Sequence, residues 1–260
     1  QILLKYPNFD EKRAQKLAQE NARYLISVFT PATVMEYTVN FGQLNYIINW
    51  AKDYIEKGGN DAFSLKLKET FREFLQAMPD LEVEGLDSRT KNRSFSLFAQ
   101  RKTRNEEFGE NYSTTYLASF AQLAQAQRHR TLAYEMTLLD EAQYYVPPII
   151  RGTELEEKWL EDISSLKEFF PQGMLVQVNE RGTIENFVLK CTERLCGSAQ
   201  LEIMEQTQKT MAKYLEATKE QPELYNYLLP YPKGARCTFP GWKCNSPCIF
   251  GGKDAMHRSI

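Results

Sequence analysis

The chain has 260 residues, 42 % of them hydrophobic and 25 % charged, which is typical of a soluble globular protein with one large domain or two small ones. The formal net charge of -2 gives no global attraction to nucleic acid or anionic membrane, so an anion site has to come from a local cluster of cations. No apolar run approaches the roughly 20 residues of a membrane span, and no signal-peptide pattern opens the chain. Five cysteines, an odd number, favour a reducing cytoplasm over a disulfide framework.

The first eighty residues or so combine helical stretches with a pair of strands. Residues 10–22 have helical periodicity, and Asp10 is the expected N-cap. Runs of β-branched and aromatic residues predict strands over 24–29 and 34–39, with a turn at Thr30-Pro31. Two amphipathic helices follow, with stripes at Leu44, Ile47, Ile48, Ala51, Tyr54 and Ile55, and then at Leu67, Phe71, Phe74, Leu75 and Met78.

Residues 80–111 break this periodicity. The segment begins acidic and becomes basic from Arg89 to Arg104, as is typical of a solvated linker between two structural units. A phosphate-binding loop is the alternative, because lysine and arginine near backbone donors hold phosphate well. A nucleic-acid-binding module is a further alternative, against which the net charge argues. The apolar residues Phe95, Leu97 and Phe98 predict a packed strand over 95–99.

The second half of the chain returns to helical periodicity. A helix is predicted from Tyr112, capped by Ser113, to Arg128, and a strand over 174–178, after which Asn179 turns the chain into a helix. Further helices carry stripes at Leu155, Trp159, Leu160, Ile163 and Leu166, at Ile184, Phe187, Val188 and Cys191, and at Ile203, Met211, Tyr214 and Leu215. Together these elements predict an α+β fold, helix-dominated, with a small, mainly antiparallel sheet.

Arg128-His129-Arg130 is the candidate functional motif of the chain. His129 is one of two histidines in the chain. Two guanidiniums offer forked donors to an anion or an electron-rich ring, and the imidazole between them can stack or share a proton. The alternative is an arginine-rich helix end that is solvated and has no chemical role.

An internal repeat indicates a duplication. Ala22-Arg23-Tyr24, followed by Thr38-Val39-Asn40 before a helix, is echoed by Ala142-Gln143-Tyr144, followed by Gln177-Val178-Asn179 before a helix. Because the chain opens abruptly at Gln1, we expect it to be a piece of a longer protein.

Three segments taken together resemble the flavin-dependent thymidylate synthase family. Gln125 leads into Arg128-His129-Arg130, Val178-Asn179-Glu180-Arg181 follows, and Arg194 stands shortly before Ala199-Gln200-Leu201-Glu202-Ile203. The order and rough spacing agree with the family over residues 113–216, and residues 20–78 resemble the later half of the same domain. The resemblance implies the end of a first repeat at 1–79, a linker or loop at 80–111, a second repeat at 112–228 and a cysteine-containing tail at 229–260.

The resemblance also implies an activity. Family members convert deoxyuridine monophosphate (dUMP) to thymidylate, with methylenetetrahydrofolate as carbon donor, reduced FAD as hydride donor and NADPH as reductant. It implies FAD contacts for Arg128, His129, Arg130, Asn179 and Arg181, and nucleotide contacts for Gln125, Thr137 and Arg194. Arg194 is the expected catalytic residue, since a guanidinium beside the pyrimidine carbonyls would stabilise negative charge on the ring. Asn179 and Arg181 are expected where a strand turns into a helix, whose N-terminus favours anions.

Two positions depart from the family's pattern. Ala133 stands where members have a serine after Arg-His-Arg, and the later Ser-x-Arg that grips the nucleotide phosphate is replaced by a segment with Thr137 and Asp140. The carboxylate of Asp140 would repel a phosphate. Either repeats or chains of a homo-oligomer therefore share one composite site, or this half has lost catalysis and acts as a scaffold for an active partner.

The C-terminal tail has a separate signal. Cys237, Cys244 and Cys248 lie in a stretch rich in proline and glycine, and His257 follows. Three thiolates and an imidazole would suit tetrahedral zinc. The spacing does not match a paired-knuckle pattern, so an ordered loop with free thiols is the alternative.

Overall fold

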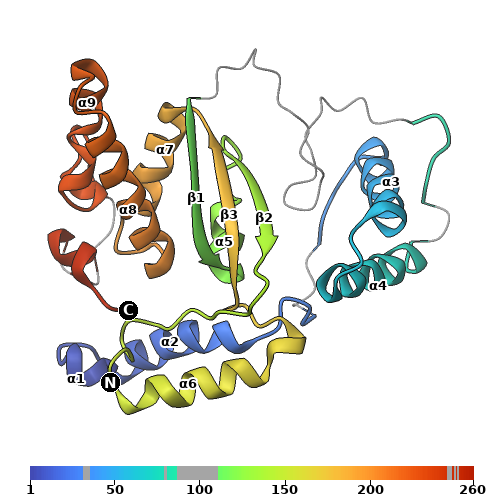
Figure 1. Cartoon of the computed structure of the whole chain (residues 1–260), viewed down its shortest axis with the longest axis horizontal. Coiled ribbons are helices and arrows are strands. Elements are labelled where there is room, and N and C mark those ends of the chain that lie inside the picture. Colours follow the sequence, from blue (N-terminus) through green and yellow to red (C-terminus); the bar gives the residue numbers. More distant parts are fainter. Residues whose placement is uncertain (32–35, 79–80, 87–110, 245–247, 249, 251) are drawn as a thin grey trace. The chain divides into compact units, whose positions relative to one another are not determined.

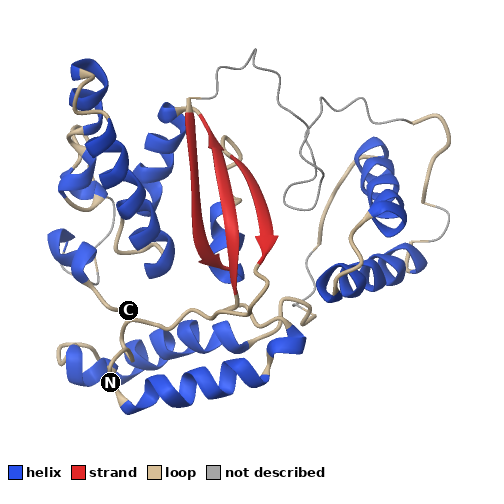
Figure 2. Cartoon of the chain, viewed as in Figure 1, coloured by secondary structure: helices blue, strands red, loops and turns tan. Residues whose placement is uncertain are grey.

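The computed structural model describes residues 1–31, 36–78, 81–86, 111–244, 248, 250 and 252–260. The chain forms two compact units, one made of Gln1–Thr30 with Arg101–Ile260 and the other of Pro31–Gln100. The beginning of the chain thus belongs to the unit that contains Arg128-His129-Arg130, whereas the repeat-based division expects a boundary after residue 79. Among the described residues helices dominate and the strands form an antiparallel sheet, so the predicted α+β class is confirmed (Figure 2).

The sheet of the larger unit has the strand order β1–β3–β2, with β1 at Tyr112–Ser119, β2 at Ala133–Leu138 and β3 at Leu175–Gly182 (Figure 1). Both pairings are antiparallel, and their register aligns Thr115 and Glu135 with Asn179 of the central strand. Side chains alternate between the two faces of a strand. Val176, Val178 and Glu180 are therefore buried on one face, while Gln177 and Thr137 are exposed on the other.

The helices of this unit are α1 (Ile2–Lys5), α2 (Glu11–Ala22), α5 (Phe120–Ala126), α6 (Glu154–Ser165), α7 (Ile184–Arg194), α8 (Leu201–Ala217) and α9 (Pro222–Leu228). Helices α7 and α8 cover the buried face of the sheet: the ring of Tyr112 stacks on Phe187 at 4.4 Å, and Tyr214 packs against both. Figure 1 shows α2 and α6 running past one end of the strands. The two ends of the chain meet there, where Ser259 donates its backbone N–H to the Tyr6 hydroxyl at 2.8 Å.

A buried polar cluster holds α7 to the sheet. The Lys190 ammonium donates to Glu180 at 2.7 Å, and both side chains are fully buried. The hydroxyls of Tyr112 and Tyr116 donate to the same carboxylate at 2.8 and 2.7 Å. Charge and hydrogen bonding are therefore satisfied inside the core, as a buried ion pair requires.

The smaller unit contains the helices α3 (Phe41–Lys57) and α4 (Ala62–Gln76). The Asn40 side chain caps α3 by accepting from the backbone N–H of Gln43 at 2.8 Å, and Asp61 caps α4 in the same way. The two helices pack through aromatic rings, Trp50 meeting Phe71 edge-on at 5.2 Å. The predicted pair of amphipathic helices is confirmed.

The predicted strands over 24–29 and 34–39 are wrong where the structure describes them. Residues Arg23–Leu25 form a 3₁₀ helix, and Ser27 makes an isolated bridge to Pro171. Ile26 and Val28 exchange backbone hydrogen bonds with Gln172 and Phe170, but residues 172–173 form a turn, so the pairing does not extend into a strand. Residues 36–39 form no strand. Residues 34–35 and the strand predicted over 95–99 lie outside the described residues.

The helix predicted from Tyr112 is wrong for its first half. Residues 112–119 form β1, and the helix begins at Phe120, capped by Ser119 instead of Ser113. Ser119 Oγ accepts from the backbone N–H of Gln122 at 3.0 Å. Strand β2 was not predicted. In both places, pairing with β3 overrides the local periodicity, because strand preference depends mainly on the neighbours that a strand finds.

The strand predicted over 174–178 is confirmed but continues to Gly182. Asn179 and Arg181 are therefore strand residues, and the prediction that they lie at a helix N-terminus is wrong. Helix α7 begins after Thr183, whose hydroxyl accepts from the backbone N–H of Asn186 at 3.3 Å. Asn179 pairs with Thr115 and Glu135 across the sheet, so it does not cap a helix.

Candidate functional site

Arg128-His129-Arg130 forms the turn between α5 and β2. The Ser119 cap starts α5, and the short helix ends at Ala126, so the three residues follow directly after its last turn. His129 is 6 % exposed, whereas Arg128 and Arg130 are exposed. The turn thus points its imidazole inward and offers its two guanidiniums to ligands from outside.

His129 and Arg194 are in direct contact, although 65 residues separate them. Arg194 Nε donates to His129 Nε2 at 2.6 Å, and Arg194 Nη2 donates to the backbone carbonyl of Gln125 at 3.2 Å. Arg194 ends α7, and Gln125 lies in the last turn of α5. Three residues that the family resemblance singled out therefore meet at one place.

The His129 imidazole is neutral in this arrangement. Burial lowers its pKa to about 4, and the positive charges of Arg194 and Lys190 act in the same direction, against a smaller opposing effect of Glu180. Because Nε2 accepts the bond from Arg194, we assign the ring proton to Nδ1, which lies 3.5 Å from a Glu193 carboxylate oxygen. With a neutral ring this contact is a polar contact and carries no ion-pair charge. His129 is thus a base that orients a guanidinium.

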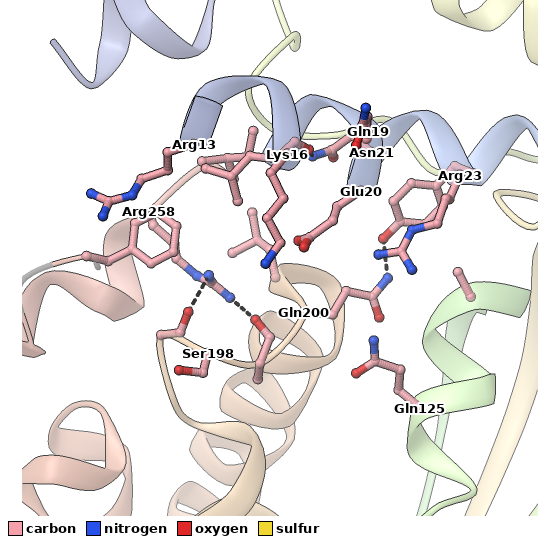
Figure 3. Close-up of a pocket in the computed structure, with 18 of the residues that line it drawn as sticks. Arg13, Lys16, Gln19, Glu20, Asn21, Arg23, Gln125, Ser198, Gln200 and Arg258 are labelled. Carbon is pink, nitrogen blue, oxygen red and sulfur yellow. Dashed lines mark hydrogen bonds between the residues drawn. The ribbon is translucent and has the colours of Figure 1, made fainter. Parts of the chain in front are cut away.

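A groove of about 1030 Å³ lies beside this contact (Figure 3). Its walls come from α2, α5, residues 197–201 and the end of the chain, and Gln125 belongs to both the groove and the contact with Arg194. Five cationic side chains line it against two carboxylates; they are Lys12, Arg13, Lys16, Arg23 and Arg258 against Asp10 and Glu20. The volume lies just above the roughly 300–1,000 Å³ of ligand pockets. The local cation cluster that an anion site requires is therefore present.

A second buried carboxylate lies under the groove. Glu202 accepts from the Ser119 backbone N–H at 2.7 Å, from Ser119 Oγ at 2.5 Å and from the Tyr24 hydroxyl at 3.0 Å. Burial raises the pKa of Glu202 to about 7, despite these hydrogen bonds. Tyr24 and Gln200, which bond each other, line the groove above it. Glu202 was seen in the sequence as part of a motif, and Tyr24 as part of a repeat, but neither was predicted as a site residue.

Asn179, Arg181 and Thr137 do not join this site. By the register of the sheet they lie on the face opposite to the buried Glu180 and Tyr134. Asn179 Nδ2 donates to Thr115 Oγ1 at 3.1 Å, and Arg181 lies 3.8 Å from Glu135. The sheet itself therefore separates these three predicted ligand contacts from His129 and Arg194.

The cysteines of the tail differ in exposure. Cys237 and Cys244 are exposed, Cys248 is half-buried and His257 is exposed. Within the described ranges, no three side chains of the His, Cys, Asp and Glu types are placed to hold a metal ion. The predicted zinc site therefore gains no support from the geometry.

Comparisons with protein-family models, with curated proteins and with solved structures found no match to this chain. In the described part of the chain, none of the helices has the length and apolar character needed to cross a membrane.

Proposed function

We propose that the chain is a flavin-dependent thymidylate synthase, or one repeat of such an enzyme, that methylates dUMP with methylenetetrahydrofolate. The observation that supports it best is the contact of Arg194 with His129 and with the Gln125 carbonyl. The sequence motifs that carry the resemblance are far apart in the chain, and nothing in composition or periodicity requires them to meet. Their meeting beside a cationic groove is what a shared binding site needs.

The residues of the turn fit a flavin nucleotide in part. Arg128 and Arg130 are exposed and would hold the phosphates or the ring edge of FAD, because a guanidinium binds anions with forked donors. The His129 ring is buried and its Nε2 accepts from Arg194, so it would act through Arg194 and would not touch the cofactor. Reduced FAD, when bound, would supply the hydride, with NADPH as the reductant.

Arg194 is the residue to which we assign the catalytic role. Its Nε and one Nη are held by His129 and Gln125, which fixes the plane of the guanidinium. The remaining N–H groups could donate to a pyrimidine carbonyl and stabilise negative charge that develops on the ring. A neutral His129 suits this task, since a protonated imidazole could not accept the bond from Arg194.

The test is thymidylate formation by the purified protein supplied with FAD, NADPH, methylenetetrahydrofolate and dUMP. We expect a flavin absorbance band after purification and turnover that falls at least about a hundredfold in Arg194→Gln, since removing one oriented donor costs that much in other enzymes. Arg72→Gln, an exposed arginine of α4, is the matched control and should be fully active. Absence of both flavin binding and turnover would contradict the proposal.

A non-catalytic scaffold of the same fold is the second candidate. The closed bonding of His129 and the presence of Ala133 and Asp140 where the family has phosphate-binding chemistry favour it. The paired change of Arg128 and His129 to alanine separates the two roles. Activity of the assembled protein should collapse if this turn binds the flavin and should stay nearly unchanged if the chain supports an active partner.

A further inference from the structure

The two ends of the groove differ in chemistry. One end carries amide and phenol groups, from Gln125, Gln200 and Tyr24, and adjoins Arg194 through Gln125. The Arg23 side chain also lies at this end, near Gln200 (Figure 3). The other end carries cations: Figure 3 shows the Lys16 side chain pointing from α2 into the groove toward the guanidinium of Arg258. A ligand that fits both ends needs a polar group at one end and an anion at the other.

Arg258 is a largely buried residue in the wall of the groove. Its side chain belongs to a residue that is 9 % exposed, and its guanidinium lies over the Phe250 ring at 4.7 Å. Nη1 donates to the Gly197 carbonyl at 2.8 Å and Nη2 to the Ala199 carbonyl, while Nε is buried without a hydrogen-bond partner. Across the described residues no carboxylate forms an ion pair with it. Two carbonyls and an aromatic ring face hold this buried guanidinium, and none of these described partners carries a negative charge, which favours a bound anion.

Lys16 adds a second charge from another element. Positions 13, 16, 20 and 23 recur at the spacing of one helical face, and all four side chains line the groove. Glu20 also points into it (Figure 3), but no ion pair joins it to Lys16 in the described part of the structure. The other lining carboxylate, Asp10, is engaged as the N-cap of α2, where it accepts from the Arg13 backbone N–H at 2.7 Å. Apart from Arg23, which lies near Gln200 at the other end (Figure 3), the cations Lys16 and Arg258 therefore leave an excess of positive charge at this end.

An unsatisfied acceptor marks the opposite end. Gln200 Nε2 donates to the Tyr24 hydroxyl, while Gln200 Oε1 is buried without a partner. An acceptor left in this way costs free energy unless a ligand or a water donates to it. A ring N–H of a nucleobase is such a donor.

We propose that the Lys16–Arg258 end of the groove binds the phosphate of a nucleoside monophosphate, whose base lies at Gln125 and Gln200. The assignment of the base end rests on the proposed function; the phosphate end rests on the two cations themselves. Ammonium and guanidinium donors form charge-assisted hydrogen bonds to phosphate oxygens. They would replace the Ser-x-Arg that the segment around Thr137 and Asp140 lacks. The contacts to the phosphate then come from α2 and from the C-terminal segment of the same chain.

The experiment measures binding of dUMP, deoxyuridine and inorganic phosphate to the full chain by titration calorimetry. Lys16→Glu should weaken dUMP and phosphate binding at least about tenfold, the loss expected for a charged hydrogen bond, and leave deoxyuridine binding unchanged. Lys213→Glu, an exposed lysine of α8 outside the groove, makes the same change in net charge and should bind all three as the unchanged protein does. Arg258→Lys should weaken the same two ligands if it folds, and Lys16→Glu keeps the test valid if it does not.

The outcomes separate this proposal from the proposed function. Equal dUMP binding by the wild-type chain and Lys16→Glu would overturn the phosphate site and leave the flavin and turnover assays untouched. If phosphate binds in a Lys16-dependent way but dUMP does not bind, the phosphate site at Lys16 and Arg258 is supported. The proposal that the chain binds and methylates dUMP is then contradicted. If neither phosphate nor dUMP binds to the wild-type chain, the site is wrong.

Discussion

Two glutamates in the larger unit are buried in contrasting ways. Glu180, on the central strand, meets the Lys190 ammonium and two tyrosine hydroxyls. Glu202, at the start of α8 under the groove, meets neutral donors, the Ser119 backbone and hydroxyl and the Tyr24 hydroxyl. Glu180, which has a cation beside it, holds α7 to the sheet in the core. Glu202 has no cation beside it; burial raises its pKa to about 7, and it lies next to the candidate site.

The contrast shows how a neighbouring opposite charge compensates a carboxylate that is buried away from water. An ammonium compensates the charge of a buried carboxylate, whereas hydrogen bonds from neutral groups offset only part of the lost hydration. Raised pKa values at the edge of a groove are typical of functional sites. The contrast also predicts that changes at the two places act differently on stability.

The largest effect is expected from Lys190→Met. The substitution keeps most of the side-chain volume but leaves the Glu180 carboxylate buried without its cation, which should cost about 3–5 kcal/mol of unfolding free energy. Urea denaturation measures this loss. Lys219→Met, which removes the exposed ion pair with Glu216, is the control and should cause no measurable change. Equal effects of the two substitutions would contradict the role given to Lys190.

Glu202→Gln should change how stability depends on pH. The pKa of Glu202 rises from its ordinary 4.5 to about 7 on folding, so its contribution to stability is complete below pH 4.5 and is lost as the pH rises through 7. The amide keeps the neutral state at every pH, and the hydroxyls of Ser119 and Tyr24 can turn to accept from it. Relative to wild type, the variant should therefore gain up to about 3 kcal/mol between pH 4.5 and pH 8.

Denaturation at pH 4.5, 6 and 8 measures this change. Glu223→Gln, an exposed position at the start of α9, is the matched control and should follow the wild type. A Glu202→Gln variant that loses stability equally at all three pH values would show that the hydrogen bonds matter and the burial of charge does not.

A smaller effect of opposite sign is expected from His129→Gln. The pKa of His129 falls on folding to about 4, so the stability that this group contributes is present above pH 6.5 and is lost as the pH falls through 4. The glutamine variant should lose this dependence, and about 1 kcal/mol at neutral pH from the weakened bond to Arg194. The variant should also lack the imidazole NMR signal that titrates near pH 4, whereas replacing the exposed His257 should leave that signal in place.

Local sequence was sufficient for the capped amphipathic helices. Asp10, Asn40 and the stripes of α3, α4, α6 and α8 act within a few residues, so the helix and its N-cap can be read from neighbouring positions. The strands could not be read in this way. Residues 112–119 have a helical stripe and form β1 because β3 supplies their hydrogen-bond partners.

The candidate site was predicted only in part. The sequence motifs led to Gln125, His129 and Arg194, which do meet, and also to Asn179, Arg181 and Thr137, which lie across the sheet from them. A one-residue change in strand register decides on which face a side chain lies, and no local pattern fixes that register. The groove was not predicted at all, since α2, α5 and the C-terminal segment meet only through long-range packing.

The amino-acid sequence by itself determined the starts of α2 and α3, the α+β class and the chemical types that gather near Arg128-His129-Arg130, because these depend on propensity, capping and composition. The tertiary structure alone decided which face of the sheet each polar residue takes, that Arg194 holds a neutral His129, and that Arg258 is buried in the wall of a groove without a carboxylate partner among the described residues. Burial and charge pairing are properties of neighbours in space, and the chain acquires those neighbours only when it folds.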